Sequence, residues 1–313
     1  MLIALGGNAL AGADGESRPD EERAAVDDAM ESVADLVETG HHVVLTHGNG
    51  PQVGNLLLKN ELAAEQVAPE PLDWCVAQTQ ASIGMLVMNA LDRALRERGR
   101  PARIAALVSR TLVDADDPAL AAPTKPIGRY VTQPEAAVMI EHGQHWVDLG
   151  ERGWRRVVGS PQPRQCLDVA AARTLADAGY VVVCSGGGGI PTVHDEAGLT
   201  GIEAVVDKDL TAALLAEELH ADLLLIATDV EAAVVDWGTP KARPLGIVTA
   251  AELRKYAAEG HFAPGSMGPK VEAACRFTER TGRPAVITAL TSISAAVGGT
   301  AGTHVEPGLN DLP

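Results

Sequence analysis

The sequence predicts an α/β fold in which a mainly parallel sheet lies between layers of helices. Strand-like and helix-like segments alternate along the chain of 313 residues. Several strand-like segments are continuously apolar, including residues 181–183 and 223–226, and such runs suit strands covered on both faces. Alternation of this kind is typical of parallel strands joined by crossover helices, where ligands bind beyond the carboxyl ends of the strands.

The first half of the chain begins with a predicted strand over Leu2–Leu5 and an amphipathic helix over residues 19–39. Gly40 follows this helix, and glycine readily takes the left-handed conformation that ends a helix. The alternation then continues with predicted strands over residues 41–46 and 104–108 and predicted helices over residues 51–66 and 79–98.

The second half continues the pattern, with one interruption. The stretch 111–165 carries six prolines, two of the four tryptophans and no clear sheet strand. A structureless loop of that length is uncommon in a compact domain, so we expect a small protruding subdomain inserted there. Beyond it we expect helices over residues 167–178, 210–219, 250–259 and 269–281, and strands over residues 180–184, 223–227 and 285–288.

Composition excludes several classes of protein. The chain holds 42 acidic and 25 basic residues, and this net charge of −17 argues against a nucleic-acid surface. No apolar run reaches the roughly 18 residues that span a bilayer, and the N-terminal residues suit a strand rather than a signal peptide. We therefore expect a cytoplasmic protein, without membrane contact or a protein-held metal, whose four separated cysteines are reduced: Cys75, Cys166, Cys184 and Cys275.

Three glycine-rich turns lie where anions are expected to bind, at residues 5–10, 46–54 and 265–270. The second and third lead into predicted helices, whose first N–H groups and positive dipole ends favour an anion. Any one such turn can simply reverse the chain. Three together indicate a site that holds more than one anion, as a phosphoryl-transfer enzyme requires.

The lysines are few and their placement is informative. Only six of the 25 basic residues are lysines, and Lys125, Lys208 and Lys270 lie in loops rich in glycine, proline or aspartate. Lysine carries a compact charge on a flexible stem that can follow a moving phosphoryl group, whereas the arginine fork is rigid. The alternative is a chance distribution of so few residues.

Two carboxylates, Asp207 and Asp209, flank Lys208 directly before the predicted helix over residues 210–219. In one interpretation Asp209 is a helix cap and Lys208 is solvated. In the other, the carboxylates orient lysines toward phosphate or help to hold the Mg²⁺ that accompanies ATP. The two further loop lysines favour the second interpretation.

A run of four glycines within residues 185–191 favours close approach of the backbone to a ligand over a linker. It is not a dinucleotide fingerprint, because no helix follows directly, and the chain contains no GxxxxGK[ST] loop. We interpret His47, beside Gly48, as a turn residue that bonds to the backbone rather than as a catalytic base. Asp229 either binds a nucleotide or caps a turn.

Nine segments in combination are specific to one group of proteins. They are ALGGNAL (4–10), THGNGPQVG (46–54), PTKPIG (123–128), RRVVGSPQP (155–163), SGGGGIP (185–191), EAVVDKD (203–209), ATDV (227–230), FAPGSMGPKVEAA (262–274) and GTHV (302–305). On these segments the chain resembles the amino-acid-kinase family, and within it the carbamate kinases, over almost its whole length.

The resemblance implies one domain over residues 1–313 with an open eight-stranded sheet, usually in a homodimer. An N-terminal lobe (about 1–200) would bind carbamate and the phosphoryl group, and would include the protruding subdomain at about 111–165. A C-terminal lobe (about 201–313) would bind the nucleotide. The implied reaction is reversible phosphoryl transfer between ATP and carbamate, which gives ADP and carbamoyl phosphate with Mg²⁺ as cofactor.

The resemblance also assigns roles to individual residues. Catalysis would fall to Lys125, Lys208, Lys270, Asp207 and Asp209. Carbamate and the transferring phosphoryl group would lie against Gly6, Gly7, Asn8, Gly48, Asn49 and Gly50. The nucleotide would contact Asp229, Ser266, Met267 and Gly268 together with Lys208 and Lys270.

Four positions depart from the wider family pattern. Ala4 stands where related kinases carry a lysine, a replacement typical of carbamate kinases. Val234 stands where a tyrosine is usual, and Gly159 and Arg129 stand where prolines are common. The alternatives are another small-acid kinase of the family, such as one that acts on an acylamino acid, and a non-catalytic ligand sensor. The three loop lysines favour an enzyme over a sensor.

Overall fold

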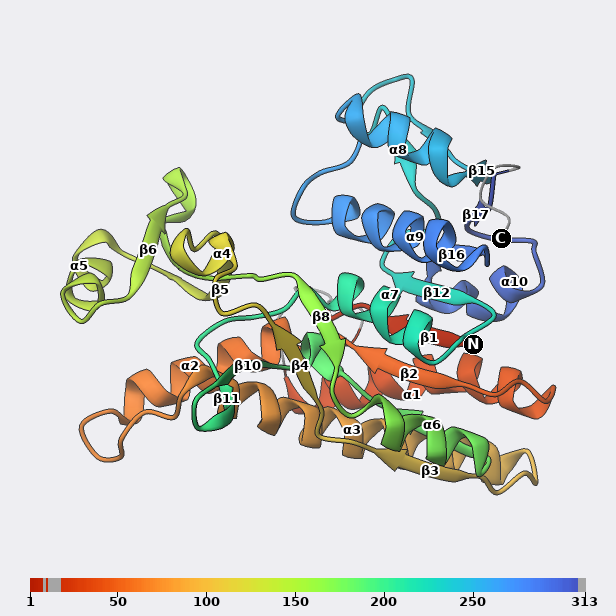
Figure 1. Ribbon diagram of the computed structural model, residues 1–313, viewed down its shortest axis with the longest axis horizontal. Helices are drawn as coiled ribbons and strands as arrows, with labels where there is room; N and C mark the ends of the chain where they lie inside the picture. Colours follow the sequence, from red (N-terminus) through yellow and green to blue (C-terminus); the bar gives the residue numbers. More distant parts are fainter. Residues whose placement is uncertain (8–9, 11–17, 309–313) are drawn as a thin grey trace.

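The centre of the protein is an eight-stranded, mainly parallel sheet, as the sequence predicts (Figure 1). This computed structural model describes residues 1–7, 10 and 18–308. Neighbouring strands run parallel except for the antiparallel pair β16 and β17. The order across the sheet is β15 (Ile247–Thr249), β17 (Thr303–Glu306), β16 (Ala285–Ala289), β12 (Leu224–Thr228), β1 (Leu2–Leu5), β2 (Val44–His47), β9 (Tyr180–Val183) and β3 (Arg103–Ala106).

Helices cover both faces of this sheet and bury an apolar core on each side. Strand β1 shows the division, because Leu2 and Ala4 belong to one core while Ile3 and Leu5 belong to the other. A fully buried strand is therefore apolar throughout instead of alternating. The first core is closed by α6 (Val169–Asp177), α7 (Lys208–Glu218), α8 (Ala250–Ala258) and α9 (Met267–Thr281), and the second by α1 (Pro19–Glu38), α3 (Leu72–Glu97) and α10 (Ile293–Val297).

Local sequence signals predict the end of one helix correctly and miss the start of another. Helix α1 ends at Glu38, and the predicted stop at Gly40 follows it with a φ of 93°; the His41 N–H donates to the Leu36 carbonyl at 3.0 Å. Helix α3 begins seven residues before the predicted residue 79. Its first N–H, on Leu72, donates to the Glu203 carboxylate at 2.8 Å. That cap is 131 residues away in the sequence, so no local pattern could indicate it.

The prediction of no clear sheet strand within residues 111–165 is wrong. Five strands lie in or at the edge of that stretch, in two small sheets that are antiparallel except for the parallel pair β10 and β4. They escape notice because they are short, partly exposed and interrupted by glycine and proline. The four-stranded sheet has the order β11 (Gly198–Gly201), β10 (Ile190–Asp195), β4 (Arg110–Val113) and β8 (Pro163–Cys166), and the three-stranded sheet has the order β5 (Lys125–Val131), β7 (Trp154–Val158) and β6 (His145–Asp148).

The three-stranded sheet, with its adjoining helices, forms the small protruding subdomain (Figure 1). We call residues 118–158 the arm. Its own small core is built from Val131, Ala136 and Trp146. The arm also contains α4 (Pro118–Ala121), α5 (Gln133–Glu141) and the short η2 (Gly150–Arg152), and its strand β5 packs against α2 (Gly50–Ala63) of the main body.

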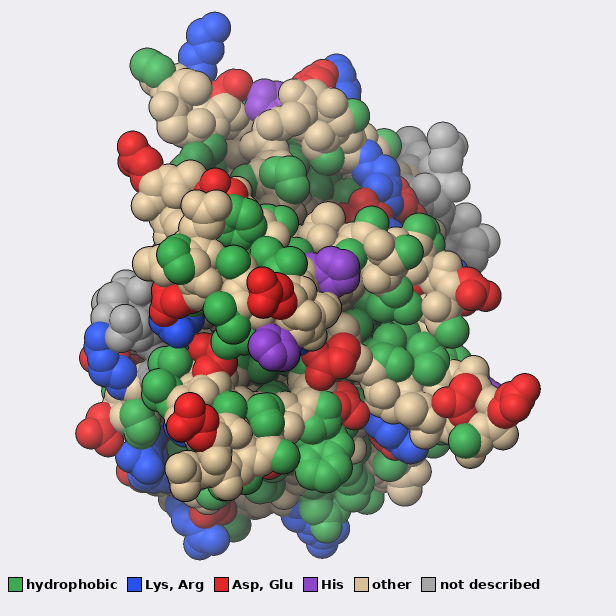
Figure 2. All heavy atoms as spheres, turned by 90° about the vertical axis from the view of Figure 1, so that its left-hand side faces the viewer, with side chains coloured by type: hydrophobic (Ala, Val, Ile, Leu, Met, Phe, Trp, Pro, Cys, Tyr) green, Lys and Arg blue, Asp and Glu red, His purple; other side chains and the backbone are tan. Residues whose placement is uncertain are grey.

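The surface on the side of the arm mixes acidic, basic and apolar side chains rather than presenting one continuous basic face (Figure 2). None of the described helices is long and apolar enough to cross a membrane. The remaining elements are the hairpin β13 (Val234–Val235) and β14 (Arg243–Pro244) and the short helices η3 (Gly186–Gly188) and η4 (Leu290–Ser292).

Candidate active site

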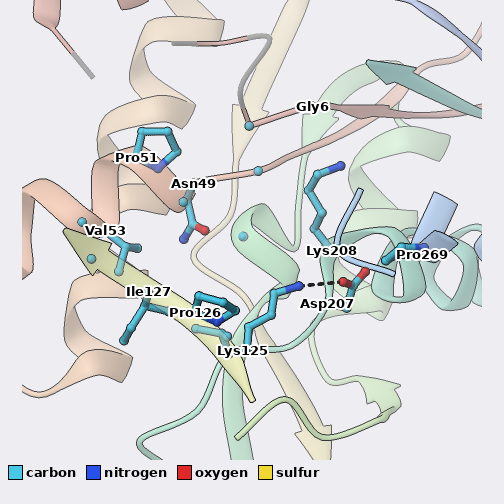
Figure 3. A pocket seen from close by; sticks show the side chains of 18 of the residues that line it. Gly6, Asn49, Pro51, Val53, Lys125, Pro126, Ile127, Asp207, Lys208 and Pro269 are labelled. Carbon is cyan, nitrogen blue, oxygen red and sulfur yellow. Dashed lines mark hydrogen bonds and ion pairs between the residues drawn. The ribbon is translucent and has the colours of Figure 1, made fainter. Parts of the chain in front are cut away.

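A cavity of about 930 Å³ opens at the carboxyl ends of four neighbouring strands (Figure 3). Gly6 follows β1, Gly48 follows β2, Gly187 lies just beyond β9 and Asp229 follows β12. Parallel strands end at the same edge of a sheet, so turns that are far apart in sequence meet there. The predicted site residues that line this cavity are Gly6, Gly7, Gly48, Asn49, Gly50, Lys125, Asp207, Lys208, Asp209, Asp229, Ser266 and Lys270.

Three predicted residues are not placed on the cavity wall. Asn8 lies outside the described residues. Met267 and Gly268 stand in the first turn of α9 but do not line the cavity, although Ser266, Pro269 and Lys270 around them do. Met267 packs against the apolar core, and Gly268 lies against the Ala263 carbonyl, 3.0 Å from where a Cβ would be.

The first two glycine turns touch each other. A Cβ on Gly48 would lie 2.6 Å from the Gly7 nitrogen and 3.0 Å from Cδ of Lys208. Such distances leave no room for a side chain, so only glycine lets the ends of β1 and β2 approach this closely. The contact brings both turns against the stem of Lys208 at the floor of the cavity.

The glycine run after β9 packs tightly against other segments of the protein. Its glycines approach other segments of the protein: a Cβ would lie 2.4 Å from His47 Nε2 at Gly186, 2.1 Å from Asn49 Nδ2 at Gly187 and 2.3 Å from the Val206 carbonyl oxygen at Gly188. Only Gly187 of the run lines the cavity. The run therefore packs the turn after β2 against the segment before α7.

Asp207 joins the start of α7 to the arm. One carboxylate oxygen caps the helix, because it accepts from the N–H groups of Asp209 at 3.0 Å and Leu210 at 3.3 Å. The other oxygen accepts from Nζ of Lys125 at 2.9 Å, the contact drawn in Figure 3. The N-cap that the sequence suggests for Asp209 thus belongs to Asp207.

Asp209 is the centre of a lysine cluster. Its side chain is buried, one oxygen accepts from Lys208 Nζ at 2.6 Å, and the other accepts from Lys270 Nζ at 3.2 Å. Burial would raise the pKa of Asp209, but the charges of Lys208 and Lys270 outweigh it and hold that pKa below its usual range. Burial, with Lys208 nearby, lowers the pKa of Lys270. A single carboxylate therefore fixes two ammonium groups that face the cavity.

His47 is a buried structural residue rather than an exposed base. Its Nδ1 donates to the Gly48 carbonyl at 2.9 Å. Burial, assisted by the charge of Lys208, lowers the pKa of His47 to about 4 despite the bond to Gly48. The ring is neutral near pH 7 and holds the second glycine turn in place.

This shift predicts a loss of stability in weak acid. The unfolded chain takes up a proton at this histidine near pH 6.5, whereas the folded chain takes it up near pH 4. Stability therefore falls as the pH drops from about 6.5 to 4. We expect the free energy of unfolding to drop by about 2 kcal/mol more between pH 7 and pH 5 in the wild type than in His47→Asn. Urea unfolding at both pH values measures this difference, and equal losses would contradict it.

Sequence reasoning missed one wall of the cavity, which is shared by α2 and the arm. Apart from Val53 and Gly54, its residues lie outside the glycine-rich turns, and their proximity depends on how the arm folds back. They are Val53, Gly54, Asn55, Leu58, Tyr130 and Arg155. Tyr130 and Arg155 are 25 residues apart in the sequence, and no local pattern links them. Only the antiparallel pairing of β5 with β7 shows that they are neighbours.

The glycine turns, the lysine cluster and the sheet together define a site for phosphoryl transfer of the kind used by small-acid kinases. The model of the amino acid kinase family matches residues 1–289. The chain therefore belongs to the amino acid kinase family.

Its relatives within that family narrow the comparison to carbamate kinases. The chain is 41% identical to the carbamate kinase of Pyrococcus furiosus over 98% of this chain and 99% of that protein. It is also 39% identical to the carbamate kinase-like protein YahI of Escherichia coli over 97% of this chain and 98% of that protein. Among solved structures, carbamate kinase from Giardia lamblia bound to AMP-PNP superposes with a TM-score of 0.93, at 39% identity over 98% of each chain.

Proposed function

We propose that the protein is a carbamate kinase, which transfers a phosphoryl group reversibly between ATP and carbamate. The observation that carries the proposal is the cluster in which buried Asp209 fixes Lys208 and Lys270 beside two touching glycine turns. The full-length similarity to carbamate kinases supports the choice of substrate. The cluster offers positive charge at fixed positions, which is what the transition state of phosphoryl transfer needs.

In this mechanism the protein positions two substrates and neutralises charge. Carbamate, held at the turns of Gly7 and Gly48, attacks the terminal phosphorus of ATP in line with the leaving ADP oxygen. Lys208 and Lys270 stabilise the negative charge that develops on the phosphoryl oxygens and the leaving group. Lys125 reaches the same place from the arm. No protein nucleophile is needed, because the carbamate oxygen itself forms the new bond.

The described residues fit a Mg²⁺ ion that arrives with the nucleotide. They include no group of three or more His, Cys, Asp and Glu side chains placed to hold a metal. Mg²⁺ is commonly held by nucleotide phosphates with only one or two carboxylates. Asp229 is suited to that role, since it lines the cavity and accepts a hydrogen bond from the neighbouring Thr228 hydroxyl at 3.0 Å. The ion would neutralise phosphate charge.

We also propose the division of the chain that the resemblance implies. The turns and arm within residues 1–200 would bind carbamate and the phosphoryl group, and residues 201–313 would bind the nucleotide through Asp229 and the start of α9. A cytoplasmic homodimer is proposed on the same similarity. The catalytic and substrate-binding roles given above to individual residues belong to this proposal.

A coupled assay tests the function directly. We expect ATP to form from ADP and carbamoyl phosphate, and we expect the rate to vanish when EDTA removes the divalent metal. The metal is required because the lysines alone do not neutralise the nucleotide phosphates. N-acetylglutamate with ATP is the matched control substrate. Phosphorylation of N-acetylglutamate without turnover of carbamoyl phosphate would assign the protein to another small-acid kinase, and specific ligand binding without either reaction would indicate a sensor.

A further inference from the structure

Arg155 of the arm is held in an orientation that leaves it facing the cavity. It pairs directly with Tyr130 across strands β5 and β7, after a register shift between Ile127 and Tyr130. Within this irregularity Gly128 has a φ of 66°, and its carbonyl accepts from Arg155 Nε at 3.1 Å. The guanidinium carbon lies 5.0 Å from the centre of the Tyr130 ring. Irregularities of this kind commonly redirect side chains next to functional sites.

Arg155 differs from Arg129 and Arg156 in its lack of an acidic partner. Arg129 pairs with Glu61 at 3.3 Å, and Arg156 pairs with Glu203 at 2.9 Å. Among the described residues no carboxylate lies within ion-pair distance of Arg155. In a chain with a net charge of −17, a guanidinium that lines the cavity without a carboxylate is a feature that calls for an anionic ligand.

The local field around Tyr130 is positive. A hydrogen bond from Arg152, with a smaller contribution from the charge of Arg155, lowers the pKa of Tyr130. A guanidinium that is anchored at Nε and supported by an aromatic ring keeps its fork geometry, which matches the oxygens of a carboxylate or phosphate. Asn55 and Leu58 of α2 line the same cavity.

This end of the cavity is separate from the lysine cluster. Lys125 pairs with Val158 and Tyr130 pairs with Arg155, so the two positions lie three residues apart along β7. Three residues of a strand span about 10 Å. Arg155 and Lys125 therefore enter the cavity from different positions along the arm.

We propose that Arg155 and Tyr130 form an outer oxyanion site, which captures the phosphate group of the acyl phosphate substrate before it moves to the lysine cluster. The identity of this substrate rests on the proposed function. A dianion that approaches a strongly acidic protein is repelled over long distances, and a positive group at the arm end of the cavity offsets that repulsion locally. The site therefore acts on the rate of capture rather than on the chemical step.

Steady-state kinetics test the proposal with Arg155→Ala. We expect KM for carbamoyl phosphate to rise about tenfold, as for a lost charge-assisted hydrogen bond, while kcat and KM for ADP change less than about twofold. In Arg155→Lys, KM for carbamoyl phosphate should rise less than in Arg155→Ala, since lysine keeps the positive charge but lacks the guanidinium fork. Arg164→Ala is the matched control. Arg164 lies on β8 away from the cavity, is exposed and pairs with Asp114.

A titration with inorganic phosphate provides a readout without turnover. Calorimetry with the wild type should show tighter phosphate binding than with Arg155→Ala, while Arg164→Ala should match the wild type. Unchanged KM together with an unchanged phosphate isotherm would overturn the outer site, and so would a loss of ADP affinity. If the wild type makes no ATP at all, the proposed function fails, whereas the phosphate titration still decides whether the site exists.

Discussion

Lys270→Ala is expected to lower the turnover of ADP and carbamoyl phosphate by about 10²–10³-fold. The physical reason is that Lys270 is partly desolvated and fixed by the buried Asp209, so its charge acts through a medium less polar than water. A preorganised contact to the phosphoryl oxygens is then lost entirely. Lys208→Ala should behave in the same way, because the other oxygen of Asp209 holds it at 2.6 Å.

The measurement is kcat in the coupled assay, with folding checked by thermal unfolding. Lys270→Arg should restore little activity, because the planar fork occupies different space from an ammonium group. Lys255→Ala is the matched control: this lysine is 74% exposed on α8 and pairs only loosely with Glu259 at 4.0 Å. Wild-type turnover in folded Lys270→Ala would show that the cluster is structural.

The second large effect is expected for Lys125→Ala. Lys125 lies on β5 of the arm and crosses the cavity to Asp207 at 2.9 Å. We expect turnover to fall about 10²-fold or more while ADP affinity stays nearly unchanged. The Lys125 side chain is more than one-third exposed, so the ion pair contributes little stability by itself. The effect should come from the lost charge over the phosphoryl group and from weaker closure of the arm over the cavity.

Turnover and ADP binding must be measured on the same folded variant. Reduced turnover with intact ADP binding supports the role of the arm in catalysis. Unchanged turnover would make Lys125 a solvated loop residue, whereas loss of ADP binding would place it in the nucleotide site. Asp207→Asn is informative beside it, because it keeps a polar cap on α7 but removes the charge that Lys125 contacts.

Much of the central fold was predictable because its signals are local. The apolar runs of β9 and β12, the amphipathic pattern of α1 and the stop at Gly40 each follow from a few adjacent residues. A strand that is buried on both faces must be apolar throughout, so it remains visible without knowledge of its partners. The same holds for glycine turns at strand ends, since the topology of a parallel sheet brings them to one edge.

The sequence alone thus determined the sheet class, the glycine turns and the three loop lysines. Only the tertiary structure decided how these parts meet: that Asp209 holds Lys208 and Lys270 together, that Asp207 rather than Asp209 caps α7, and that the glycine run packs against the segments before α2 and α7. It also decided how the strands of the arm pair, which brings Arg155 to Tyr130. The physical reason is that these contacts join residues distant in the chain, where distances, burial and the resulting pKa values arise from packing rather than from neighbouring residues.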